Sequence, residues 1–243
     1  GPSRLLPPRN RSSLFMRDGF RKFALLLRKD LTVEWRSREV MLIGGLFSLV
    51  IIALFVFSGL NSRAIAEQAV SSALWVSIAF IGTVVFTRTF QRESEHQAIE
   101  QLMLVRRIAG PLFAAKLATN FLLLVLLEVP LVLLTLMTFG IDVSLAFLPV
   151  MAVIVSGTLG FSALGSVLSA ALSAVRLREV LLPIVLFPLT IPLFISGAQA
   201  TQLLLGGGWT SEATDWMMII VMFDVIFLLV GRWLFGEVVE PAG

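Results

Sequence analysis

Residues 143–175 read VSLAFLPVMAVIVSGTLGFSALGSVLSAALSAV and contain no charged side chain. An apolar run of eighteen or more residues is long enough to cross a bilayer as a helix. Backbone held in lipid must satisfy its own hydrogen bonds, and an α-helix does this within one segment. This stretch therefore predicts a transmembrane helix, and it sets the standard for judging the other apolar runs.

The composition of the whole chain also indicates a membrane protein. Of its 243 residues, 57% are hydrophobic and only 14% are charged, whereas soluble domains have about 25% charged residues. We predict an all-α integral membrane domain over residues 40–236, with six transmembrane helices. They are expected at about 40–60, 68–88, 114–140, 144–174, 179–198 and 215–235.

Residues 14–39 are expected to form an amphipathic helix that lies in the membrane interface. Apolar side chains share one arc of this helix, and basic side chains suited to anionic headgroups fill the other. Two roles stay open: a simple anchor, or an elbow that also braces the bundle and a partner. Residues 1–13 are predicted to be a disordered, tag-like N-terminus, and residues 237–243 a C-terminal tail.

The basic residues collect on one side of the predicted membrane domain. Six crossings place both termini on the same side, and eighteen of the nineteen Lys and Arg residues fall there, leaving only Arg63 on the other. Short cytoplasmic segments carry the excess of Lys and Arg in membrane proteins. Both termini and the loop at 89–113 are therefore predicted to be cytoplasmic.

Several kinds of chemistry are absent from the sequence. The chain has no cysteine, which excludes disulfides, thiolate metal sites and covalent haem attachment through Cys. It has no GxxxxGK[ST] phosphate-binding motif. We therefore expect no catalytic residue, metal site or bound cofactor in this chain, and no nucleic-acid partner. Any ATP chemistry would belong to another subunit.

The segment QRESEHQAIEQLMLVRRIAGP, residues 91–111, is short and polar between two long apolar runs. From Arg92 to Leu104 it has good helix formers and neither Gly nor Pro. Ile99, Leu102 and Met103 form a small apolar patch on this predicted cytoplasmic helix. Such a patch must be covered, either by the chain's own bundle and lipid or by a partner protein.

Four stretches resemble the haem exporter protein B family, the CcmB-type permeases of cytochrome c maturation. The resemblance runs in the same order over about residues 20–238. The stretches are KDLTVEWRSRE (29–39), AIEQLML (98–104) with AAKLATN (114–120), GTLGFSALGSVLSAAL (157–172) and REVLLPIVLFPLTIPLFISGAQA (178–200).

The resemblance implies a type-2 ABC permease-like fold in the bacterial inner membrane. It implies that ATP hydrolysis by a separate ATPase subunit, in two copies, is coupled to haem export or haem-chaperone release. Further implied partners are a second copy of the chain, haem-handling membrane subunits and membrane lipid, with haem as a possible cargo. The loop would supply a coupling helix, and its expected ATPase contacts are Arg92, Glu95, Ile99, Glu100, Leu102 and Met103.

Two carboxylates, Glu128 and Asp224, fall inside predicted transmembrane helices. A charge at the centre of a membrane helix costs about 2.5–3.5 kcal/mol on insertion scales, so neither should face lipid. One interpretation is that they line an inner surface or contact a membrane partner. The other is that each is neutral, or hydrogen-bonded to Ser or Thr of a neighbouring helix.

Proline and small residues indicate how two of the helices are built. Pro183, Pro188 and Pro192 each remove a backbone donor from the fifth helix, which predicts either a static bend or a hinge. The glycine tract that follows suggests that the chain dips into the outer leaflet and returns. Small residues four apart in the fourth helix favour close helix packing. They include Ser156, Gly160 and Gly165.

Other functions stay open at this stage. One alternative is a type-2 ABC exporter for another cargo, such as a lipid, a glycan or a drug. A second is a membrane scaffold that does not transport. A third is a secondary transporter that would use Glu128 and Asp224 as coupling acids.

Overall fold

The computed structural model describes residues 21–32, 39–57, 63–95, 109–172, 175 and 177–239, and their regular structure is entirely helical. Residues 21–32 form a short helix, followed by six long ones. The long helices are α2 (Glu39–Phe57), α3 (Arg63–Glu95), α5 (Ala109–Thr138), α6 (Val143–Ala171), α7 (Arg178–Gly207) and α8 (Ser211–Val239). The prediction of an all-α membrane protein is confirmed.

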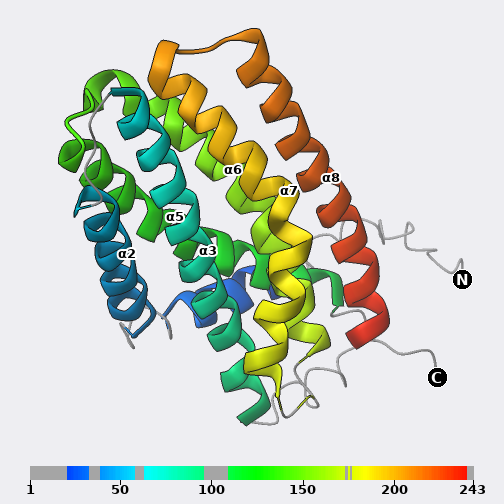
Figure 1. Cartoon of the computed structure of the whole chain (residues 1–243). Helices are drawn as coiled ribbons and strands as arrows, with labels where there is room; N and C mark the ends of the chain where they lie inside the picture. Colours follow the sequence, from blue (N-terminus) through cyan, green and yellow to red (C-terminus); the bar gives the residue numbers. More distant parts are fainter. Residues whose placement is uncertain are drawn as a thin grey trace, which may run out of the picture.

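The six long helices run alternately up and down in one bundle (Figure 1). The start of α2 and the end of α8 lie at the same end, which we call the terminal end. It also holds the end of α3 and the start of α5. The opposite end, the far end, holds the α5–α6 and α7–α8 connections. In Figure 1, α5 and α6 lie behind α3 and α7.

The prediction of six membrane spans is supported for five helices only. Within the described residues, α3, α5, α6, α7 and α8 each contain a segment long and apolar enough to cross a membrane. The apolar part of α2, Leu42–Phe57, is shorter. At 1.5 Å per residue it is about 24 Å long, against a hydrocarbon core of about 30 Å. Within the described residues α2 is therefore a shorter apolar helix packed on α3, and its crossing of the membrane stays a prediction.

Two helices extend beyond the ends expected from their apolar runs. The sequence predicts an end for the second helix near residue 88 and for the fifth near residue 198, but α3 continues to Glu95 and α7 to Gly207. The suggested dip and return does not occur, because α7 is regular helix to Gly207. A glycine with φ of 84°, Gly208, then ends it. Polarity marks the edge of the membrane, whereas a helix ends where its backbone conformation changes.

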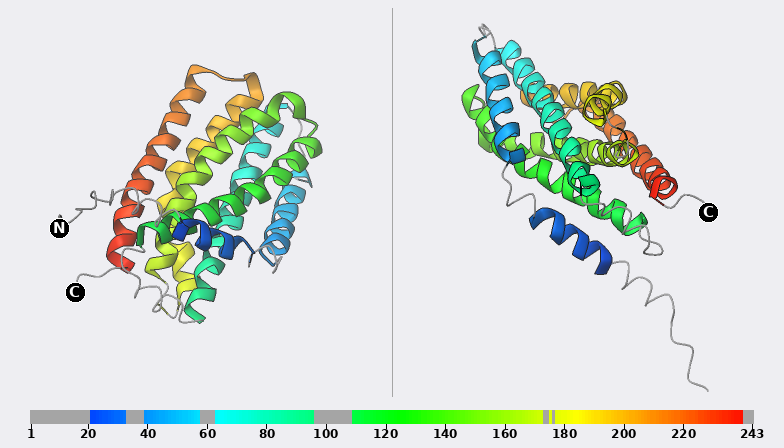
Figure 2. Two further views of the ribbon diagram at one scale, coloured as in Figure 1. Left: turned by 180° about the vertical axis from the view of Figure 1, so that it is seen from behind. Right: turned by 90° about the horizontal axis from the view of Figure 1, so that it is seen from below.

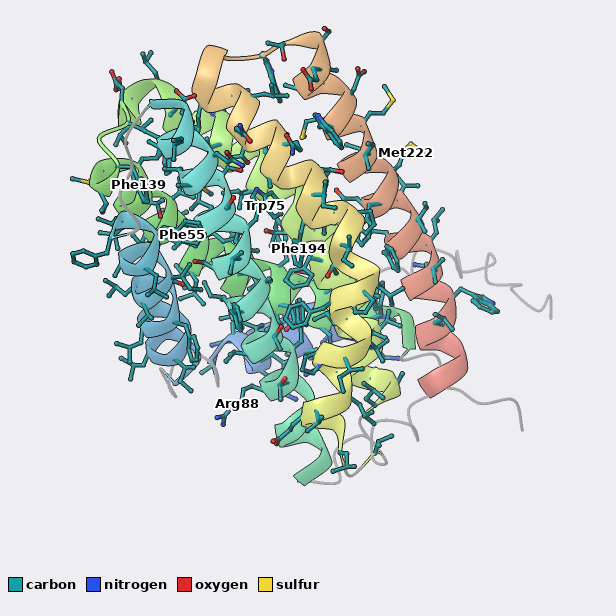
Figure 3. All side chains as sticks on the ribbon, viewed as in Figure 1. Phe55, Trp75, Arg88, Phe139, Phe194 and Met222 are labelled. Atoms are coloured by element: carbon teal, nitrogen blue, oxygen red, sulfur yellow. The ribbon has the colours of Figure 1, made fainter. Side chains whose placement is uncertain are left out.

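Helix α6 lies at the centre of the bundle and contacts α3, α5, α7 and α8. Its glycines allow large side chains from neighbours to approach. Phe86 of α3 lies against Gly165, and Trp75 of α3 lies against Gly157. Trp75 also lies against Gly197 of α7, so one indole ring joins three helices. Figure 3 shows Trp75 and Phe194 in the interior.

We expect Gly197→Ala to destabilise the fold. The added Cβ would overlap the buried Trp75 ring, and overpacking of this kind costs about 1–3 kcal/mol. Thermal unfolding in detergent, followed by size-exclusion chromatography, should show a lower Tm.

Gly45→Ala is the matched control, because a Cβ at Gly45 in α2 meets no atom within 4 Å. Its Tm should be unchanged or slightly higher, since Ala favours helix over Gly. Equal Tm values for the two variants would contradict the packing of Trp75 between α6 and α7.

Candidate functional site

A buried ion pair joins the surface helix 21–32 to α5 near the terminal end. Lys116 Nζ lies 2.9 Å from Asp30 Oδ2, and the Lys116 and Asp30 side chains are only 2% and 9% exposed. Lys29 Nζ lies 3.2 Å from the other oxygen of the same carboxylate and is half exposed. Both oxygens of Asp30 therefore contact a basic side chain, one inside the protein and one at its surface.

Apolar contacts support the same attachment. Leu26 of the surface helix packs against a small cluster that includes Leu112 and Phe113 of α5, Val167 of α6 and Leu234 of α8. Figure 2 shows the short helix lying across the bundle beside α5, not along the bundle axis. It is thus attached to the first turns of the helix that follows the predicted coupling loop.

The predicted ATPase-contact residues have side chains that lie outside the described part of the structure. The backbones of Arg92 and Glu95 belong to the last turns of α3. Ile99, Glu100, Leu102 and Met103 lie outside the described residues. The helices on either side of this segment are described: α3 ends and α5 begins at the same end of the bundle (Figure 1).

Glu128 of α5 is fully buried and faces α6. Its Oε1 accepts a hydrogen bond of 2.6 Å from the hydroxyl of Thr158. Its Oε2 has no hydrogen-bond partner among the described residues, and the same is true of the buried hydroxyl of Ser162, one helical turn along α6. The carboxyl group therefore points into the bundle and away from lipid.

Asp224 of α8 faces the other side of α6. Its Oδ1 accepts a hydrogen bond of 3.0 Å from the backbone N–H of Gly160, and its Oδ2 accepts one of 3.3 Å from Ser156. A Cβ at Gly160 would overlap this carboxylate. Glycine at this position is therefore what lets α8 approach closely enough for Asp224 to reach the α6 backbone.

Further polar contacts continue along α6 toward the terminal end. Asn120 of α5 donates a hydrogen bond of 2.8 Å to Ser166, and Ser169 donates one of 2.9 Å to the carbonyl of Phe86. Each of these side chains is buried. In lipid such bonds between helices contribute about 0.6 kcal/mol on average, and up to about 1.7. They fix how the helices are rotated relative to one another.

The three prolines predicted to kink or hinge the fifth helix all lie inside α7, which stays one continuous helix through Pro183, Pro188 and Pro192. Hydroxyl groups bond to carbonyls of the same region. Thr190 donates to the carbonyl of Leu186, and Ser196 donates to the carbonyl of Pro192. The structure shows one conformation of this segment, and a hinge motion stays a prediction.

Sequence reasoning missed the residues that attach the surface helix. Both residues lie in stretches that carry the family resemblance, and Lys116 is one of the basic residues of the cytoplasmic side, but neither is assigned a partner from the sequence. A signal was present, because Lys116 stands alone in the apolar stretch FAAKLATN. A lysine buried in such a stretch needs an acidic partner. The role of Trp75 left no comparable signal, because a tryptophan in a membrane helix has many possible neighbours.

The fold and its buried contacts define a class: a multi-pass, all-helical membrane protein whose intramembrane polar groups bond between helices. The family model described as CcmB protein matches residues 21–240. The chain therefore belongs to the CcmB family, and this prediction is confirmed. Membership implies a permease component of ABC-type haem export in cytochrome c maturation. A comparison with curated proteins finds no match.

We expect Lys116→Asp and Asp30→Lys each to lower stability and to release the surface helix. Breaking a buried ion pair costs about 3–5 kcal/mol, and the lower part of this range applies because Lys29 also contacts Asp30. The double variant, with the charges exchanged, should recover part of the loss. Limited proteolysis within residues 21–38 and the Tm measure both effects.

Lys29→Ala is the control, since an exposed ion pair contributes about 0–1 kcal/mol. If the double variant lost as much stability as the two single variants lose in sum, the ion pair would not be what holds the surface helix.

Proposed function

We propose that this chain is the permease subunit of a type-2 ABC complex in which a separate ATPase docks at the terminal end. The observation that carries the proposal is that α3 ends and α5 begins at that end (Figure 1). The segment that joins them contains the AIEQLML motif of the family resemblance. A partner that grips this segment would act directly on two helices of the bundle.

The proposed orientation places the terminal end in the cytoplasm of a bacterium, with the chain in the inner membrane. Eighteen of the nineteen Lys and Arg residues fall in segments assigned to that side. This distribution is the one that positively charged cytoplasmic loops produce. An ATPase needs cytoplasmic ATP, so the same orientation suits the proposed partner.

The mechanism is mechanical, and this chain supplies no catalytic group. ATP would bind to the partner, and closure of two ATPase copies would displace the coupling segment. A partner can shift a bundle between two states only if its contacts with those states differ. Lys116 and Leu112 tie the first turns of α5 to the surface helix and to α6 and α8. A displacement of α5 would therefore reach most of the bundle.

Haem enters the proposal as cargo or as the group released from a haem chaperone, and not as a cofactor of this chain. Family membership supports this role. The complex would contain a second copy of the chain and haem-handling membrane subunits. Glu128 and Asp224 bond to α6, so in this structure they serve contacts between helices.

We expect Glu100→Lys and Leu102→Asp to uncouple the ATPase. Glu100→Lys reverses a charge on the surface that the partner would bury, and Leu102→Asp adds a charge to its apolar patch. An unpaired charge buried in an interface typically costs about 2–5 kcal/mol of binding free energy. Co-purification of the ATPase and its stimulation by the permease should both fall at least tenfold, while the permease keeps its Tm.

Glu212→Lys is the matched control, because Glu212 is an exposed residue of the first turn of α8 at the far end. It should leave co-purification and stimulation unchanged. Normal ATPase binding and stimulation in the Glu100 and Leu102 variants would refute docking at this segment.

A further inference from the structure

A groove with a volume of about 540 Å³ lies at the far end of the bundle, between the first turns of α6 and the last turn of α7. Leu145 and Leu148 line its α6 side and are 74% and 75% exposed. Residues 206–208 and Trp209 line its α7 side. Because its α6 wall is so exposed, the groove opens onto the surface that the bundle presents to lipid.

The α7 wall of the groove consists of Leu204 and Leu205 followed by three glycines, residues 206–208, which present only backbone. The positive φ of Gly208 requires glycine. Gly207 is different, since its φ is not in the left-handed region and a Cβ there would meet no atom within 4 Å. Neither backbone conformation nor packing against the described residues explains glycine at 207. What the missing side chain provides is open space inside the groove.

One carboxylate stands in the lining of this groove. Asp142 Oδ1 accepts hydrogen bonds from the hydroxyl of Ser144 at 2.7 Å and from its backbone N–H at 2.9 Å. These bonds hold the pKa of Asp142 below its ordinary value, so the group is ionised at neutral pH. It also caps the N-terminus of α6. The helix end that would otherwise attract an anion is thus already neutralised.

Two further negative features lie near the groove. Helix α7 ends there, and a helix C-terminus carries the negative end of the helix dipole. The carboxylate of Glu67 lies beside Gly206, 3.1 Å from the position of an added Cβ. An ammonium group would be attracted by this surface, whereas a phosphate with no cation beside it would be repelled.

The lining suits a hydrocarbon chain and not a peptide. Apart from Asp142, every lining side chain is apolar or is Trp209. A peptide segment entering such a groove would leave most of its N–H and C=O groups without partners, which is costly in a membrane. Trp209 is 59% exposed, and exposed tryptophan is typical of the level at which headgroups begin.

We propose that this groove binds one phospholipid with an ammonium headgroup, phosphatidylethanolamine, whose acyl chain lies along residue 207 and whose ammonium contacts Asp142. The ammonium contacts the exposed carboxylate of Asp142 and carbonyls of the last α7 turn. Such charge-assisted hydrogen bonds are stronger than neutral ones. The site is independent of the ATPase docking proposed above.

The test uses the 243-residue chain, purified in detergent and supplied with equal amounts of phosphatidylethanolamine and phosphatidylglycerol bearing identical acyl chains. Lipid that stays bound is counted by native mass spectrometry. We expect the protein to retain the ethanolamine lipid up to about fivefold over the glycerol lipid, the preference that one charge contact at the exposed Asp142 supports.

Two variants separate the two halves of the site. Gly207→Leu fills the groove and should lose the retained lipid. Asp142→Asn keeps the helix cap, because Asn caps as well as Asp, but should lose the preference for the ethanolamine lipid while still binding lipid. Gly45→Leu is the matched control, with equally open space on α2, and should behave like the unaltered chain.

Trp209 gives a second measurement that does not depend on lipid counting. Phosphatidylethanolamine with brominated acyl chains should quench Trp209 fluorescence, identified by difference from Trp209→Phe, and Gly207→Leu should reduce this quenching. Equal retention of both lipids by the unaltered chain would overturn the proposal. So would lipid retention and quenching in Gly207→Leu that match those of Gly45→Leu.

Discussion

The central constraint on this bundle is that one helix, α6, must contact four others in a solvent that gives them no hydrophobic reason to associate. Lipid tails are as apolar as leucine, so helices in a membrane are held by close packing and by hydrogen bonds. Gly157, Gly160 and Gly165 provide the close packing on α6, each receiving a side chain of a neighbour. Once α8 lies against Gly160, Asp224 can reach its backbone N–H. The close packing at Gly160 and the hydrogen bond to Asp224 therefore depend on each other.

Much of the fold follows from the sequence, because membrane thickness leaves few solutions for long uncharged runs. The five helices that are long and apolar enough to cross a membrane were predictable for this reason. A sixth crossing by α2 stays a prediction, since the apolar part of α2 within the described residues is shorter. Helix ends were poorly predicted. Helix α3 continues past its apolar run to Glu95, and α7 continues past its own to Gly207. A helix depends on backbone conformation and hydrogen bonds, and it does not require apolar side chains.

The buried carboxylates show where sequence reasoning stops. Glu128 and Asp224 stood out as costly in lipid, and the possibility of bonds to Ser or Thr was foreseen. Their partners Thr158 and Ser156 were not, because sequence does not give the rotation of one helix against another. Asp30 and Lys116 were missed for a related reason. They lie far apart in the chain, and only the tertiary structure shows that the surface helix lies across the start of α5.

The lengths of the connections divide the chain into two blocks. Helices α5 to α8 are joined by short links, residues 139–142, 172–177 and 208–210, whereas residues 96–108 separate α3 from α5. The α2–α3 hairpin is nevertheless fastened to the other block by Trp75, whose indole ring packs against Gly157 and Gly197 and donates a hydrogen bond of 3.1 Å to the hydroxyl of Thr201. Any displacement of the hairpin would have to repack this ring.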